Sequence, residues 1–160
     1  MAKEHLEIYL NDHLAGSVVA LELIQDMLDF EPAPSDMKRC LADLREEIQA
    51  DRKELQALMD RLGIAESRTR KIASWLTEKV ARIKMRADDK GSGALRLLES
   101  LEALELGIHG KFALWRALRA AATVAPELCG FDYDTLLARA EIQEGQVEAF
   151  RLEAAKQALA

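Results

Sequence analysis

The sequence predicts an all-α protein, and three observations support this fold class. Ala, Leu, Glu, Lys and Arg dominate the 160 residues, a mixture that favours helix over strand. Only three prolines and eight glycines occur, so long segments are free of helix-breaking residues. Apolar residues also recur with the period of an amphipathic helix along most of the chain. We therefore expect a single domain, residues 1–160, built around one core.

The first two expected helices form a hairpin around a proline-containing loop. The first helix covers residues 3–29 and ends before "EPAPS", whose two prolines do not continue a helix. Ser35 is then the expected N-cap of the second helix, residues 36–62. Gly63 follows directly, at the position where glycine commonly ends a helix.

Three more helices are expected in the rest of the chain. The third covers residues 68–87 and stops at "DDKGSG". The fourth covers residues 94–124 and is followed by the loop "APELCGFD". Asp132 or Asp134 caps the fifth, which reaches almost to Leu159. Four of the five helices are each about 40 Å long at 1.5 Å per residue, and such helices joined by short loops pack as an antiparallel four-helix bundle.

The two hairpins of this expected bundle resemble those of ferritin-like proteins. The first pairs "HLEIYLNDHL" with "MKRCLADLREEIQADRKELQALMDRLG", and the second pairs "LLESLEALELGIHGKFALW" with "LLARAEIQEGQVEAFRLEAA". The resemblance covers nearly the whole chain at the level of architecture. It makes the shorter third helix the crossover between the hairpins, and it implies a di-metal site with a Glu-x-x-His motif on each of two helices. The sequence contains no Glu-x-x-His.

Polar residues interrupt the apolar faces of the expected helices. A buried charge without a partner costs several kcal/mol, so each should have a neighbour that pairs with it. Residues equally far from the turn of an antiparallel hairpin face each other, which pairs His13 with Asp51 in the first hairpin. The ionisable residues within the apolar faces are His13, Asp51, Glu105, Glu144 and Arg151.

The same argument gives two pairs in the second hairpin, Glu105 with Arg151 and His109 with Glu144. One interpretation is that these are structural ion pairs that fix the register of the helices. The other is a metal site with fewer ligands than a complete di-metal centre, formed by Glu105, His109 and Glu144, which would hold iron or another divalent metal.

Two glycines flank His109 inside the fourth expected helix. Gly107 and Gly110 each cost about 1 kcal/mol relative to alanine at such positions. Close approach of a neighbouring helix would explain them, and so would a cleft beside His109.

Several classes of protein are disfavoured by composition. The net charge of −6 argues against nucleic-acid binding, which needs a positive surface. No apolar run approaches the roughly 18 residues of a membrane span, and the N-terminus lacks the apolar core of a secretory signal. Cys40 and Cys129 have no metal-ligand spacing, which favours a reduced cytoplasmic protein.

The third expected helix, residues 68–87, is unusually basic. Seven Lys or Arg and a single acid, Glu78, lie between Arg68 and Arg86. We expect this helix to pack against the acidic remainder of the chain or against a symmetric partner. The alternative is that it binds a polyanion or an acidic membrane surface.

These observations favour a ferritin-like bundle protein without a complete di-iron site, with a structural or interaction role as a homodimer. The alternative is a metal-binding protein or metal-dependent oxidoreductase that uses this smaller site of carboxylates and histidine. A third hypothesis is a protein that binds a small apolar ligand between the hairpins. No catalytic triad, phosphate-binding loop or dinucleotide motif is present, so the sequence favours a protein that is not an enzyme.

Overall fold

The computed structural model describes residues 2–67, 75–85 and 93–160, and every regular element within these ranges is helical. The all-α prediction is therefore confirmed. No helix in the described ranges is both long and apolar enough to cross a membrane. The elements are α1 (Ala2–Asp29), α2 (Ser35–Arg61), α3 (Trp75–Met85), α4 (Gly93–Ala121), the 3₁₀ helix η2 (Pro126–Leu128) and α5 (Tyr133–Leu159).

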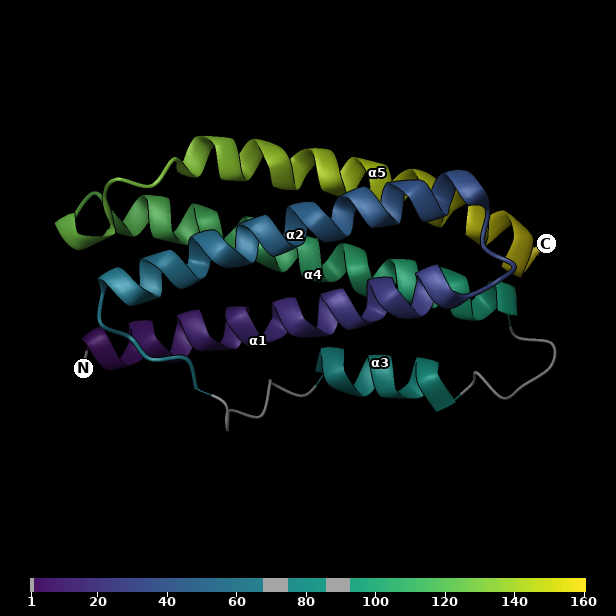
Figure 1. Ribbon diagram of the computed structural model, residues 1–160, viewed down its shortest axis with the longest axis horizontal. Coiled ribbons are helices and arrows are strands. Elements are labelled where there is room, and N and C mark those ends of the chain that lie inside the picture. Colours follow the sequence, from purple (N-terminus) through teal and green to yellow (C-terminus); the bar gives the residue numbers. More distant parts are fainter. Residues whose placement is uncertain (1, 68–74, 86–92) are drawn as a thin grey trace.

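The four long helices lie side by side (Figure 1). Helices α1 and α2 run antiparallel, as do α4 and α5, whereas α2 and α4 run in the same direction. Helix α1 contacts α2 and α4, and α5 contacts α4 along most of its length and α2 more sparsely. Helix α3 lies outside this group and packs on α4. It runs back along the molecule beside α1, as a crossover between the two hairpins does (Figure 1).

The helices of the first hairpin, α1 and α2, begin and end close to the expected residues. Helix α1 ends at Asp29, as predicted. Helix α2 begins at Ser35 itself, one residue early, and its N-cap is Pro34, which has no side-chain cap. The prediction that Ser35 is the N-cap is therefore wrong. Gly63 follows α2 with a φ of 63°, the left-handed conformation expected of a glycine that ends a helix.

The later helices differ more from expectation. Helix α4 ends at Ala121 rather than at residue 124. The following residues instead form turns, because Pro126 disfavours a helical conformation at Ala125. Asp132 caps α5 by accepting a hydrogen bond from the Thr135 amide at 3.1 Å, as predicted. Of the third expected helix, residues 75–85 are helical, and residues 68–74 and 86–87 lie outside the described part of the chain.

The buried apolar side chains form two clusters along the axis of the long helices. One extends from the α1–α2 loop to the level of Ile48 and Ile108 and includes part of α3. The other surrounds Trp115 and Tyr133 near the α4–α5 loop. Trp115 is 1% exposed and is a core residue. The candidate functional site lies where the two clusters meet.

Candidate ligand-binding cavity and buried polar layer

A cavity of about 350 Å³ lies between α1, α2 and α4, at the boundary of the two core clusters. This volume lies within the usual range for small-molecule sites, which are concave and mostly apolar. Ile48 and Ile108 from one cluster and Leu55 and Leu114 from the other contribute to its wall. The apolar core is thus interrupted by a space of ligand size rather than being continuous.

Three glycines inside helices line this cavity, namely Gly16 on α1 and Gly107 and Gly110 on α4. A Cβ atom added to any of them would meet no heavy atom within 4 Å. Close approach of a neighbouring helix therefore does not require these glycines, and that explanation for Gly107 and Gly110 is wrong. The space beside them supports the alternative, a cleft in this part of α4.

A layer of polar side chains joins three of the long helices beside the cavity. Asp51 on α2 is 1% exposed, and its carboxylate accepts hydrogen bonds from Lys111 Nζ at 2.6 Å and from Arg139 Nη1 at 2.7 Å. Gln143, which is fully buried, accepts a hydrogen bond from Lys111 and donates one to Glu47 Oε2 at 2.8 Å. The layer therefore joins α2, α4 and α5.

The charges in this layer balance one another. Two carboxylates, Asp51 and Glu47, face two cations, Lys111 and Arg139. Burial lowers the pKa of Lys111, and the nearby Asp51 carboxylate acts in the opposite direction. Such a compensated, hydrogen-bonded group is stable in a core, whereas removal of one member leaves a buried charge without a partner.

The predicted pair of His13 and Asp51 is wrong. Both carboxylate oxygens of Asp51 are bound by Lys111 and Arg139, because a buried carboxylate gains more from the cationic donors of α4 and α5 than from a neutral imidazole. The prediction considered partners within one hairpin only.

His13 lies instead in the α1 wall of the cavity. Its ring meets the ring of Tyr9 edge-on, with centroids 4.7 Å apart and an interplanar angle of 74°. Burial lowers the pKa of His13, while the Asp12 carboxylate acts in the opposite direction. The imidazole is therefore neutral near pH 7.

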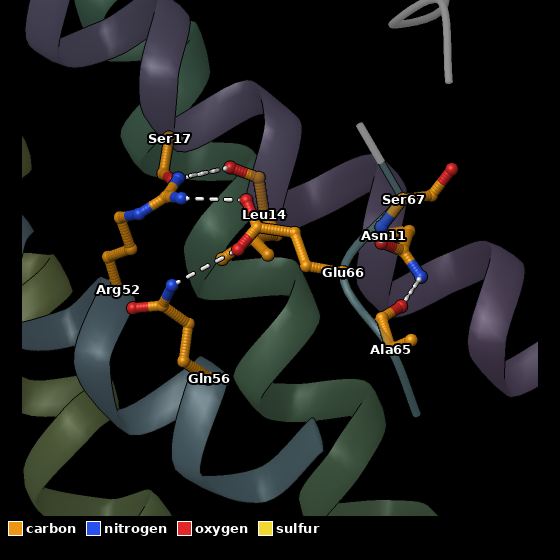
Figure 2. A network of polar contacts seen from close by, with 8 residues as sticks. All are labelled: Asn11, Leu14, Ser17, Arg52, Gln56, Ala65, Glu66 and Ser67. Atoms are coloured by element: carbon orange, nitrogen blue, oxygen red, sulfur yellow. Dashed lines mark hydrogen bonds and ion pairs between the residues drawn. The ribbon is translucent and has the colours of Figure 1, made fainter. Parts of the chain in front are cut away.

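Arg52, which lines the cavity, joins α2 to α1 through hydrogen bonds (Figure 2). Its Nη1 donates hydrogen bonds to the Leu14 carbonyl at 3.0 Å and to Ser17 Oγ at 2.8 Å. Its Nη2 donates to Glu66 Oε1 at 3.1 Å. Arg52 is thus paired with the Glu66 carboxylate, and its hydrogen bonds hold α1 and α2 together beside the cavity.

Asn11, on α1, holds the segment that follows α2 against α1 (Figure 2). Its side-chain nitrogen donates to the Ala65 carbonyl at 3.2 Å, and its side-chain oxygen accepts from the Ser67 amide at 2.7 Å. Because Asn11 is only 2% exposed, it satisfies backbone groups that would otherwise lack partners.

The predicted pair of Glu105 and Arg151 is present on the outer side of α4 and α5. Arg151 Nε lies 3.1 Å from Glu105 Oε2, and the same guanidinium also binds both carboxylate oxygens of Glu148. Burial, and then the Glu148 carboxylate, raise the pKa of Glu105, while Arg151 lowers it. Side-chain exposures of 31% for Glu105 and 25% for Arg151 place this pair at the edge of the core rather than inside it.

The predicted pair of His109 and Glu144 is also present, with His109 Nδ1 and Glu144 Oε1 2.8 Å apart. His109 is 67% exposed, so this pair lies on the surface. Among the described residues, no three His, Cys, Asp or Glu side chains are grouped so that they could hold a metal ion. Glu105, His109 and Glu144 therefore do not fit a metal centre in this structure.

The described part of the basic helix packs against acidic side chains, as predicted. Lys79 Nζ lies 3.2 Å from a carboxylate oxygen of Glu102 on α4, and Lys84 Nζ lies 3.3 Å from Asp26 on α1. The basic face of α3 is thus partly neutralised by the two helices beside it.

Sequence reasoning missed the residues that complete the polar layer, and the helical period contains a signal for two of them. Lys111 lies between Ile108 and Trp115 on the apolar face of α4, and Gln143 lies between buried residues of α5. Each interrupts an apolar face in the same way as Asp51 does. Arg139 lies at the edge of the apolar face of α5 and Glu47 at the edge of that of α2, so neither gives a comparable signal.

The fold and the site together define a class: an all-helical protein with an apolar cavity beside a charge-balanced polar layer. No family model, no curated protein and no solved structure matches this chain in the comparisons with known proteins.

Proposed function

We propose that this protein is a ferritin-like four-helix bundle that binds a small, predominantly apolar molecule in the cavity between α1, α2 and α4. The observation that carries the proposal is the set of three cavity glycines, which lie in helices and leave open space where other residues would carry a side chain. Each costs about 1 kcal/mol relative to alanine inside a helix. A ligand site gives a reason for that cost, because the cavity depends on the missing side chains.

The arrangement of the wall supports the same function. The floor combines side chains from both core clusters, including the buried ring of Trp115. Arg52 and the Asp51–Lys111 pair brace the surrounding helices through hydrogen bonds. A preformed apolar cavity in a braced framework is the usual form of a small-molecule site.

A substitution that fills the cavity tests this function. In Gly107→Leu the new side chain would occupy the space beside α4, and the helix would gain stability because leucine is a better helix former than glycine. We expect wild type to bind tetralin saturably in isothermal titration calorimetry. We expect Gly107→Leu to melt at a higher temperature and to bind tetralin with an affinity at least tenfold lower than that of wild type.

Ala113→Leu is the matched control, because Ala113 is exposed on α4 and does not line the cavity. It adds a similar side chain to the same helix and should leave tetralin binding unchanged. Absence of saturable binding to wild type, or equal binding by wild type and Gly107→Leu, would contradict the proposed function.

A second candidate function is self-association through α5, in line with the homodimer expected from the sequence. Its outward face carries exposed residues at heptad spacing, the spacing of a helix–helix contact. Three of them are large and apolar: Ile142 is 61% exposed, Leu152 49% and Leu159 72%. The heptad positions are Ile142, Gly145, Ala149, Leu152, Lys156 and Leu159.

We further propose that the protein acts in the cytoplasm. Cys40 and Cys129 are free thiols in the structure, and unpaired thiols suit a reducing compartment.

A further inference from the structure

The polar groups in the cavity wall are almost all engaged by other parts of the protein. Arg52 is bound to the Leu14 carbonyl, Ser17 and Glu66, and Ser17 Oγ itself donates to the Leu14 carbonyl at 2.5 Å. Asp51 holds Lys111 at 2.6 Å. These groups therefore need no hydrogen bond from a ligand.

His13 differs from them. Its ring is packed edge-on against Tyr9, and within the described part of the chain neither ring nitrogen has a hydrogen-bonding partner. A neutral imidazole carries one N–H donor and one acceptor nitrogen. A partly buried group of this kind gains free energy when it finds a hydrogen-bonding partner, so His13 offers a ligand an unused hydrogen-bonding position in a mostly apolar space. Within the described part of the chain, the buried Nε1 donor of Trp115, another lining residue, also lacks a partner.

The charges of the wall limit the ligand further. Two acids, Asp12 and Asp51, and two bases, Arg52 and Lys111, line the cavity. Asp51 is paired with Lys111, and Arg52 with Glu66; Asp12 also has an interaction partner. A charged ligand would have to leave water without a free counter-ion in the wall, which is costly.

We infer that the ligand is an uncharged molecule with an apolar ring or chain body and a single hydroxyl group, and that the hydroxyl is bound by the His13 imidazole. A hydroxyl suits this position because it both donates and accepts, and therefore pairs with either tautomer of the ring. His13 thus selects the polar group of the ligand, while the glycines and apolar side chains hold its body. The inference rests on the proposed function.

Three probes with one carbon framework test this inference: 1-tetralol, tetralin and tetralin-1-carboxylate. In calorimetric titrations of the full chain at pH 7.5, we expect the alcohol to bind about fivefold to tenfold more tightly than the hydrocarbon, the effect of one hydrogen bond to a group that otherwise lacks a partner. The carboxylate should bind more weakly than either. In His13→Phe, which keeps a ring beside Tyr9, the preference for the alcohol should disappear while tetralin still binds.

His5→Phe is the matched control, since His5 lies on the same helix but is exposed and outside the cavity; it should keep the preference for the alcohol. Equal binding of alcohol and hydrocarbon to wild type, tightest binding of the carboxylate, or an unchanged preference in His13→Phe would overturn the inference but not the proposed function. Binding of none of the probes would instead count against the proposed function and the inference together.

Discussion

At the scale of single residues, the stability of the core depends on an ionic contact that crosses between the two hairpins. Asp51 is almost fully buried and holds Lys111 and Arg139. Burial of Asp51 is tolerated because each of its two carboxylate oxygens accepts a hydrogen bond from a cation. The pair of Asp51 and Lys111 also forms part of the cavity wall, so its loss would affect both stability and shape.

We expect Asp51→Ala to lower the free energy of unfolding by about 3 kcal/mol, because Lys111 would remain buried without its carboxylate. The double variant Asp51→Leu with Lys111→Met should recover most of this loss, since an apolar pair of similar size needs no compensation. Urea denaturation measures both effects. Glu54→Ala, at an exposed position of α2, is the control and should stay close to wild type; an equally small effect of Asp51→Ala would contradict the assigned role.

His13 gives the stability a dependence on pH. Burial lowers its pKa in the native protein, so the unfolded chain binds the proton more tightly than the folded one. The contribution is therefore fully present above about pH 6.5, the ordinary histidine value, and is lost as the pH falls through that value toward the lower native one. The free energy of unfolding of wild type should decrease more between pH 7.5 and pH 5 than that of His13→Phe.

Denaturation curves at several pH values test this difference. Asp12, Asp51, Arg52 and Lys111 face the same cavity, but they are present in both proteins, so their effects cancel in the comparison. Parallel pH profiles of wild type and His13→Phe would show that His13 is not the group responsible.

At the scale of elements, helices α1 and α4 leave open space at their glycines, and α5 exposes a row of residues on its outer side. Gly16, Gly107 and Gly110 interrupt two long helices where no neighbour demands a glycine. On α5, exposed residues at heptad spacing form a continuous outer face. Small residues thus line the cavity in α1 and α4, whereas Gly145 and Ala149 lie within the exposed outer face of α5.

The α5 face predicts self-association. Leu152→Glu places a charge in the middle of the heptad face and should shift sedimentation equilibrium from dimer to monomer, because a charge at the centre of an apolar contact has no partner there. Val124→Glu is the control: Val124 is 85% exposed but lies in the α4–α5 loop, away from the face, and its dimer should persist. A monomeric wild type, or equal effects of the two variants, would contradict this role of α5.

At the scale of the whole molecule, most of the helical organisation could be predicted from local sequence. Gly63 and Asp132 mark helix ends through conformations and side-chain caps that depend on near neighbours only. Antiparallel pairing within a hairpin also predicted Glu105 with Arg151, although the same argument gave the wrong partner for Asp51.

Contacts between hairpins were not predictable in this way. The partner of Asp51 comes from α4 and α5, and its identity depends on how the two hairpins are aligned against each other, which no local pattern records. The cavity has the same origin, because it arises where the faces of α1, α2 and α4 do not fill the space between them. Gly107 and Gly110 indicated a special environment, but only the assembled helices distinguish open space from close contact.

The most direct test of the central claim is to locate bound 1-tetralol by nuclear Overhauser effects to methyl-labelled protein. The account predicts contacts with the methyl groups of Ile48, Leu55 and Ile108, which line the cavity from α2 and α4. Contacts confined to Ile142 and Leu152 on the outer face of α5, with none in the cavity, would contradict it.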